Sequence, residues 1–224
     1  MAKYAAGYLS PIKNKLGNAV GRKWRNIDVL AVYQPDVKNP RTTKQMATRN
    51  RLSLASHAGS MLRAAIRLGL KGITDGTSVF PRAKFVSLNV AQMPESGLTI
   101  PYAKIIVAKG SSPIADFGQV DLSTPQTAKV EWTIGGLDSI FPASVVENMK
   151  VYIVVLNVDL GVSLVSRPVA FDDGQARVTI PDAWNGMNVH VWGFTRYEGE
   201  TNDEVNLKAG MASDSTYLGS GTVN

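Results

Sequence analysis

The chain has 224 residues, of which 44% are apolar, so it fits one large or two small folded domains and is not a disordered chain. It contains no cysteine, which excludes disulfides and thiolate metal sites and is typical of folding in a reducing cytoplasm. The formal net charge is +6. Residues 1–89 have sixteen Lys and Arg and three acids, a net charge of +13, whereas residues 90–224 have eight Lys and Arg and fifteen acids, a net charge of −7. This division predicts charged partners or contacts between copies of the chain.

The first predicted element is a β-hairpin, with strands at residues 20–24 and 27–33 and a two-residue turn at Arg25-Asn26. Alternate residues of the second strand, from Ile27 to Tyr33, share one face. A lone hairpin is marginally stable in water, so we expect it to pack on another element or to be donated to the sheet of a neighbouring subunit.

A long helix is expected over residues 42–70, with Thr42 at the N-cap and Gln45 as its capping-box partner. Gly59 is a candidate interruption, and Gly69 or Gly72 a candidate end. The apolar stripe of this helix consists of Leu54, Ala58, Met61, Ala65 and Leu68. A second helix is expected near residues 80–89, after the start signal of Pro81.

Basic side chains are frequent in the hairpin and the long helix, where Arg63 and Arg67 also carry charge. The candidates for contact with DNA or a protein partner are Arg22, Lys23, Arg25, Lys38, Arg41, Lys44, Arg49 and Arg51. Such a density of charge predicts a docking surface for nucleic acid or an acidic neighbour, and solvation of exposed faces is the alternative. Trp24 and Tyr33 are candidates for stacking on bases, although packing explains them better.

From residue 100 onward, short strand-like segments alternate with turn signals. They lie at residues 104–109, 128–134, 150–157, 176–180, 188–197 and 215–218. Segment 150–157 is apolar on both faces and is therefore expected at the centre of a sheet. The pattern predicts an immunoglobulin- or fibronectin-III-like β-sandwich with Trp132 in its core. The expected fold class is thus α+β, with a basic hairpin-helix region at 1–99 and the sandwich at 100–224.

Catalytic signatures are missing from the sequence, which has neither a phosphate-binding glycine loop nor a nucleophile elbow. The two histidines, His57 and His190, have no metal-spaced partner, and Asp173-Gly174 indicates a turn. We expect no enzyme activity, no metal and no cofactor. The candidate acidic interface consists of Glu198, Glu200, Asp203 and Glu204, with a solvated loop as the alternative.

The run KLGNAVGRKWRNIDVLAVYQPDVKNPRTTKQ, followed by a long helix, resembles the start of an uncharacterised family from Bacteroidetes and their phages. The segments VEWTI, KVYIVVLN, VTIPDAWNGMNVHVWGFTRYEGE and DSTYLGSG resemble its C-terminal half. The resemblance supplies no catalytic residues. The family's association with phage gene content, including that of crAss-like phages, implies a structural role in the virion.

The leading hypothesis is therefore a structural protein of a phage virion, forming a ring or collar at the head–tail connector or in the tail. Its partners would be copies of itself, other virion proteins and, through the basic half, DNA. The N-terminus has no apolar core of signal-peptide length, so we expect assembly in the host cytoplasm and no membrane contact. One alternative is a surface or glycan-binding module, for which an exposed Trp184 would be diagnostic; another is nucleic-acid binding through residues 13–51.

Overall fold

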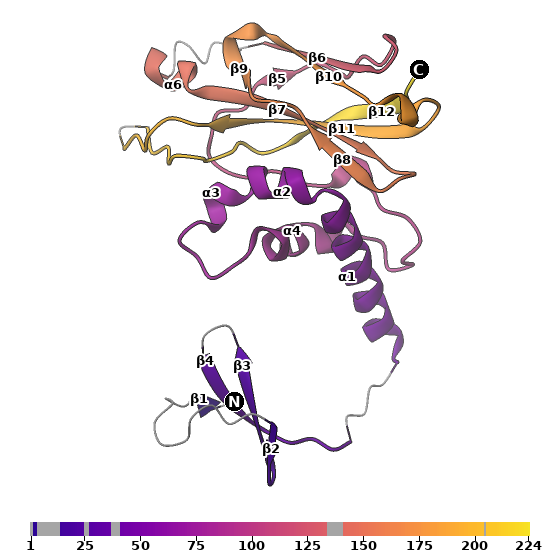
Figure 1. The fold of residues 1–224 in the computed structure, drawn as a ribbon, viewed down its shortest axis with the longest axis vertical. Coiled ribbons are helices and arrows are strands. Elements are labelled where there is room, and N and C mark those ends of the chain that lie inside the picture. Colours follow the sequence, from indigo (N-terminus) through magenta and orange to yellow (C-terminus); the bar gives the residue numbers. More distant parts are fainter. Residues whose placement is uncertain (1, 4–13, 25–26, 37–40, 134–140, 204) are drawn as a thin grey trace. The chain divides into compact units, whose positions relative to one another are not determined.

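The computed structural model groups the chain by its contacts into two compact units, Met1–Thr42 and Thr43–Asn224 (Figure 1). It describes residues 2–3, 14–24, 27–36, 41–133, 141–203 and 205–224. This division differs from the expected boundary between residues 99 and 100. The physical reason is that the helices share a hydrophobic core with the sheets that follow them.

The N-terminal unit is an antiparallel sheet with strand order β1-β4-β3-β2. Its strands are β1 (Ala2–Lys3), β2 (Asn14–Leu16), β3 (Ala19–Trp24) and β4 (Ile27–Val32). The predicted hairpin is confirmed as β3–β4, with Trp24 opposite Ile27, while its turn residues lie outside the described part of the chain. A second hairpin, β2–β3, turns at Gly17, whose φ of 58° favours glycine.

This sheet buries little apolar surface. Among the residues of the unit whose side chains are described, only Val29 is buried. Leu16 and Val32 are 62% and 77% exposed. A sheet of short strands with so small a core has a narrow margin of stability by itself.

The helices before the sheets of the second unit are α1 (Thr43–Met61), α2 (Arg63–Gly69), α3 (Lys71–Thr74) and α4 (Pro81–Asn89). The starts of α1 and α4 are close to the predicted ones, whereas α3 was not predicted. The expected long helix is divided at Leu62 rather than at Gly59, although main-chain bonding continues from Leu62 N to Ala58 O at 3.0 Å. Gly59 instead lets α4 approach, since a Cβ there would lie 3.1 Å from the Phe85 ring. Within the described ranges, no helix is long and apolar enough to cross a membrane.

Two antiparallel sheets complete the second unit, with orders β12-β11-β7-β8 and β10-β6-β5; β9 also pairs with β7. The strands are β5 (Asp116–Phe117), β6 (Thr127–Thr133), β7 (Met149–Asn157), β8 (Val162–Val165), β9 (Val169–Ala170), β10 (Gln175–Thr179), β11 (Asn188–Tyr197) and β12 (Thr216–Thr222), and helix α6 (Ala143–Glu147) precedes β7. The predictions of β6, β7, β10, β11 and β12 are confirmed, and Ile134 lies outside the described residues.

The second unit has three layers, because helices cover one face of the larger sheet and the smaller sheet lies on its other face (Figure 1). Alternate residues of β7 supply the two cores. Val151 and Ile153 join the cluster shared by the two sheets, and Tyr152 and Val154 join the cluster beneath the helices. The segment expected at the centre of a sheet is therefore central.

The prediction of a strand at residues 104–109 is wrong. The segment follows a 3-10 turn at Tyr102–Lys104, and its main chain bonds to groups outside any sheet. Asn89 Oδ1 accepts from Ile106 N at 2.7 Å, and Ser215 Oγ accepts from Val107 N at 2.9 Å. The apolar pattern correctly predicted that the segment is buried. Its main-chain hydrogen bonds, however, are made to side chains and to the end of α2, and not to a neighbouring strand.

Gly69 provides a test of how closely α2 packs on this segment. A Cβ at Gly69 would lie 2.5 Å from the Ala108 Cβ and 2.8 Å from its Cα. We expect Gly69→Ala to lower the free energy of unfolding by about 1–3 kcal/mol in chemical denaturation, because overpacking forces main chain apart. At the exposed Gly118 a Cβ would meet only Glu131 O, at 3.4 Å, so Gly118→Ala should change stability by less than about 0.5 kcal/mol. Equal stabilities of the two variants would contradict the close packing.

Candidate functional site

A series of arginine and serine side chains follows the outer surface of α1 and continues onto α2. Its members are three or four residues apart, a spacing that places them on one side of a helix. We call this series the Arg/Ser stripe; it consists of Arg49, Ser53, Ser56, Ser60, Arg63 and Arg67. Ser56 is half-buried and the other five are exposed.

Two shallow hollows follow the stripe and share Ser60. The first, of about 420 Å³, is lined by Arg49, Leu52, Ser53, Ser56, His57 and Ser60. The second, of about 350 Å³, lies between the α1–α2 junction and the turn before β8, and Arg63, Arg67, Gly161 and Val162 are among its lining residues. Every member of the stripe therefore borders a recess open to solvent.

Arg82 of α4 holds the serines at the centre of the stripe. Its Nη2 donates to Ser60 Oγ at 2.8 Å, to Ser56 Oγ at 3.2 Å and to Ser56 O at 3.3 Å. The Nη1 and Nε groups of Arg82 have no hydrogen-bond partner among the described residues. A further arginine charge thus lies beside the stripe with donors still available to a ligand.

The helical layer is strongly basic. Residues 43–94 contain eight Lys and Arg against one acid, Asp75, a net charge of +7. Arg51 is paired with Glu95 at 2.8 Å. Arg63 and Arg67, in contrast, have no ion-pair partner in the part of the chain that the structure describes. The exposed charges of Arg63 and Arg67 are therefore not compensated by an ion pair among the described residues.

The eight basic residues predicted as contacts divide between the two units, with Arg22, Lys23, Arg25, Lys38 and Arg41 in Met1–Thr42 and Lys44, Arg49 and Arg51 in α1. Arg22 and Arg41 are exposed. Arg25 and Lys38 lie outside the described residues, as does the side chain of Lys23. The sequence predicted that Arg63 and Arg67 lie on the helix, but it did not identify them as members of a site. Arg82 was not identified either. The spacing from Arg49 to Arg67 was the signal that could have identified the stripe.

The predicted acidic interface is partly engaged in an internal contact. Glu198 accepts a hydrogen bond from the Tyr152 hydroxyl and pairs with Arg196 Nη1 at 3.2 Å. Glu200 and Asp203 are exposed, as an interface requires, and Glu204 lies outside the described residues. Burial, followed by the hydrogen bond and charge of Glu198, raises the pKa of Tyr152 from 10.0 to about 12.

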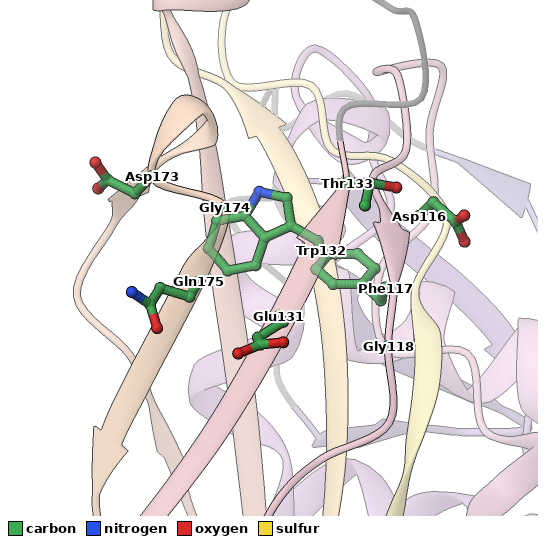
Figure 2. Close-up of a pocket in the computed structure, with 9 residues that line it drawn as sticks. All are labelled: Asp116, Phe117, Gly118, Glu131, Trp132, Thr133, Asp173, Gly174 and Gln175. Carbon is green, nitrogen blue, oxygen red and sulfur yellow. The ribbon is translucent and has the colours of Figure 1, made fainter.

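A third hollow, of about 560 Å³, lies at the edge of the smaller sheet (Figure 2). Trp132 is at its centre, and its buried Nε1 donates to Phe171 O at 2.8 Å, consistent with the predicted core position. Figure 2 shows the carboxylates of Asp116 and Asp173 on opposite sides, directed away from each other. Among the described residues, no group of three or more His, Asp or Glu side chains is placed to hold a metal ion.

Of the remaining sequence candidates, His57 is exposed beside the first hollow, whereas His190 and Trp184 lie within the packed structure. His190 stacks on Tyr102 with ring centroids 4.4 Å apart, and its Nδ1 lies 2.7 Å from the Tyr217 hydroxyl. Burial lowers the pKa of His190. Trp184, the aromatic that would have been diagnostic of a glycan site, is 4% exposed and does not offer its face to a sugar. Gly174, with a φ of 65°, forms the predicted turn before β10.

Comparison with known proteins gives a family match. The model of a family described as "Family of unknown function (DUF6266)" matches residues 11–207. The matched span includes strands β2–β4, the helices, and both sheets of the second unit except β12. No curated protein matches the chain.

The burial of Tyr152 and its hydrogen bond to Glu198 together predict a pH dependence of stability. Because the folded protein holds the phenol proton more tightly than the unfolded chain, this contribution is complete below pH 10.0 and is lost as the pH rises to about 12. Denaturation across this range should show a smaller loss of stability for Tyr152→Phe than for the parent protein. Tyr33→Phe, at the partly exposed Tyr33, is the matched control and should retain the full loss. Identical pH profiles for Y152F and the parent would contradict this assignment.

Proposed function

The chain belongs to the DUF6266 family, and from its charges and packing we propose that it is a non-enzymatic structural protein that assembles head-to-tail into a ring. In this proposal the N-terminal sheet of one copy docks on the acidic sheet region of the next copy. The contact joins two different surfaces of the same chain, and such contacts close into rings when the rotation between subunits permits.

The observation that carries the proposal is the combination of small core and high charge in Met1–Thr42. The unit contains eight Lys and Arg against two acids, a net charge of +6. Of its described side chains only Val29 is buried. A sheet of this size gains stability when another surface covers it, so it is suited to docking.

The surface proposed to receive this unit is acidic. Residues 95–224 contain fifteen acids against eight Lys and Arg, a net charge of −7. The predicted interface residues Glu200 and Asp203 are exposed there. Opposite charges accelerate association and set which surfaces meet, while Leu16 and Val32 would supply apolar surface to the contact.

The finer fold belongs to the same proposal, in which the two sheets of the second unit form an immunoglobulin-like β-sandwich. Both sheets are antiparallel, and Trp132, Val151 and Val191 belong to one buried cluster between them. A buried tryptophan on an early strand supports this assignment. The helices on the outer face of the larger sheet would be an addition to such a sandwich.

The proposed setting is a bacteriophage virion, in a ring or collar at the head–tail connector or in the tail. It rests on the family resemblance carried by the hairpin and C-terminal motifs. Other virion proteins would then be the neighbours of the ring, and assembly would take place in the host cytoplasm.

Native mass measured by light scattering tests the assembly. We expect a discrete oligomer at about 0.1 M salt that dissociates near 1 M, where the screening length falls from about 10 Å to 3 Å. The variant Arg22→Glu/Arg41→Glu reverses two exposed charges of the basic unit, and Glu200→Lys/Asp203→Lys reverses two exposed charges of the acidic region. Each variant alone should therefore be a monomer. Their mixture should form a dimer, because one intact surface of each kind remains.

The control Asp75→Lys makes an acid-to-base change on an exposed residue outside the proposed contact and should leave the oligomer intact. A parent protein that is monomeric at both salt concentrations would overturn the proposal. So would a mixture of the two variants that stays monomeric while the parent protein assembles.

A further inference from the structure

We infer that the Arg/Ser stripe of α1 and α2 binds the phosphate backbone of duplex DNA without reading its sequence. This function is separate from the proposed assembly, which uses the N-terminal sheet and the acidic region. The stripe shares only Arg49 with residues 13–51, the segment for which nucleic-acid binding was the alternative prediction, and its other members lie beyond that segment.

The chemistry of the stripe matches phosphate. Arginine and serine are among the side chains that donate hydrogen bonds to phosphate oxygens in protein–DNA complexes. No member of the stripe is acidic or apolar, and residues 43–94 as a whole carry a net charge of +7. Arg63 and Arg67 have no ion-pair partner among the described residues, so no such pair must be broken before they contact a ligand.

The centre of the stripe is arranged before any ligand arrives. Arg82 Nη2 bonds to the Oγ atoms of Ser56 and Ser60, which fixes the guanidinium beside the hollows that share Ser60. The serines are small, so a phosphate can approach the helix between the longer arginines at either end. Less side-chain entropy is lost on binding when groups are already held in place.

The serines and the absence of aromatic residues in the stripe argue against a protein partner at this surface. The centres of protein–protein interfaces are enriched in aromatic residues, methionine and arginine and depleted in serine. Leu52 and Val162 border the hollows, but three of the six members of the stripe are serines. The stripe also lacks aromatic side chains, on which single-stranded nucleic acids stack their bases.

The length of the stripe suits a duplex backbone. Arg49 and Arg67 are eighteen residues apart, which corresponds to about 27 Å along a helical path at about 1.5 Å per residue, and to less here because the path changes direction between α1 and α2 (Figure 1). Phosphates of duplex DNA follow each other at about 1.7 Å of axis when both strands are counted. Several phosphates therefore lie within reach of the charges along the stripe.

Fluorescence anisotropy with a labelled duplex of mixed sequence tests the inference on the full chain. Four arginine–phosphate contacts are expected, from Arg49, Arg63 and Arg67 of the stripe and from Arg82 beside it. The affinity for the duplex should then fall roughly 100-fold between about 50 and 200 mM salt, because each contact releases counterions. Arg63→Gln/Arg67→Gln should reduce this fall to roughly 10-fold. Both residues are exposed, and circular dichroism will check that the variant folds.

The matched control is Arg167→Gln/Arg177→Gln, which removes the same charge from exposed arginines of the sheet region. It should keep the salt dependence of the parent protein. An unchanged salt dependence for R63Q/R67Q, or an equal change in the control, would overturn the inference. The inference would also be overturned if the protein bound single-stranded DNA more tightly than duplex DNA. The same holds if R63Q/R67Q lost the native oligomer but kept its DNA binding, because the stripe would then contact another partner.

Discussion

Strands β7 and β11 are paired from Val189 opposite Asn157 to Tyr197 opposite Met149, and both faces of this pair are buried. One face contributes Val151 and Val191 to the core between the sheets, and the other contributes Val154 and Trp192 to the core beneath the helices. Each outer layer therefore depends on the same two strands for its hydrophobic contact. The position of the Arg/Ser stripe follows from this, because α1 and α2 turn toward solvent the residues that they do not bury in the core beneath the helices.

The elements that could be predicted from sequence are those whose own residues determine their partners. Segment 150–157 is apolar on both faces from Val151 to Leu156, which occurs where a strand is covered on both sides, and it forms part of the central β7. Segment 104–109 has a similar pattern but was predicted wrongly, because the groups that satisfy its main chain, on Asn89 and Ser215, are distant in sequence. The short strands β5 and β9, of two residues each, have no periodicity from which to predict them.

The candidate site was predicted only in part, for a related reason. Charge density in the sequence drew attention to the segment around Arg22 to Arg51, and Arg49 is in the stripe. Arg82 was missed because its role depends on α4 packing on α1, where Gly59 removes the side chain that would keep Phe85 away. Glu198 was predicted as an interface residue, but its hydroxyl donor is Tyr152, a residue 46 positions earlier in the chain.

The charges of the second unit, +7 in residues 43–94 and −7 in residues 95–224, cancel to zero. At long range such a body has no monopole and is an electrical dipole. Packed layers are spaced by about 10 Å, so its outer layers lie about two screening lengths apart at about 0.1 M salt. A polyanion that approaches the helices of this unit is thus attracted by that layer, while the repulsion of the far sheet is screened. The separation of charge within the neutral unit therefore orients the unit with its helices toward a polyanion.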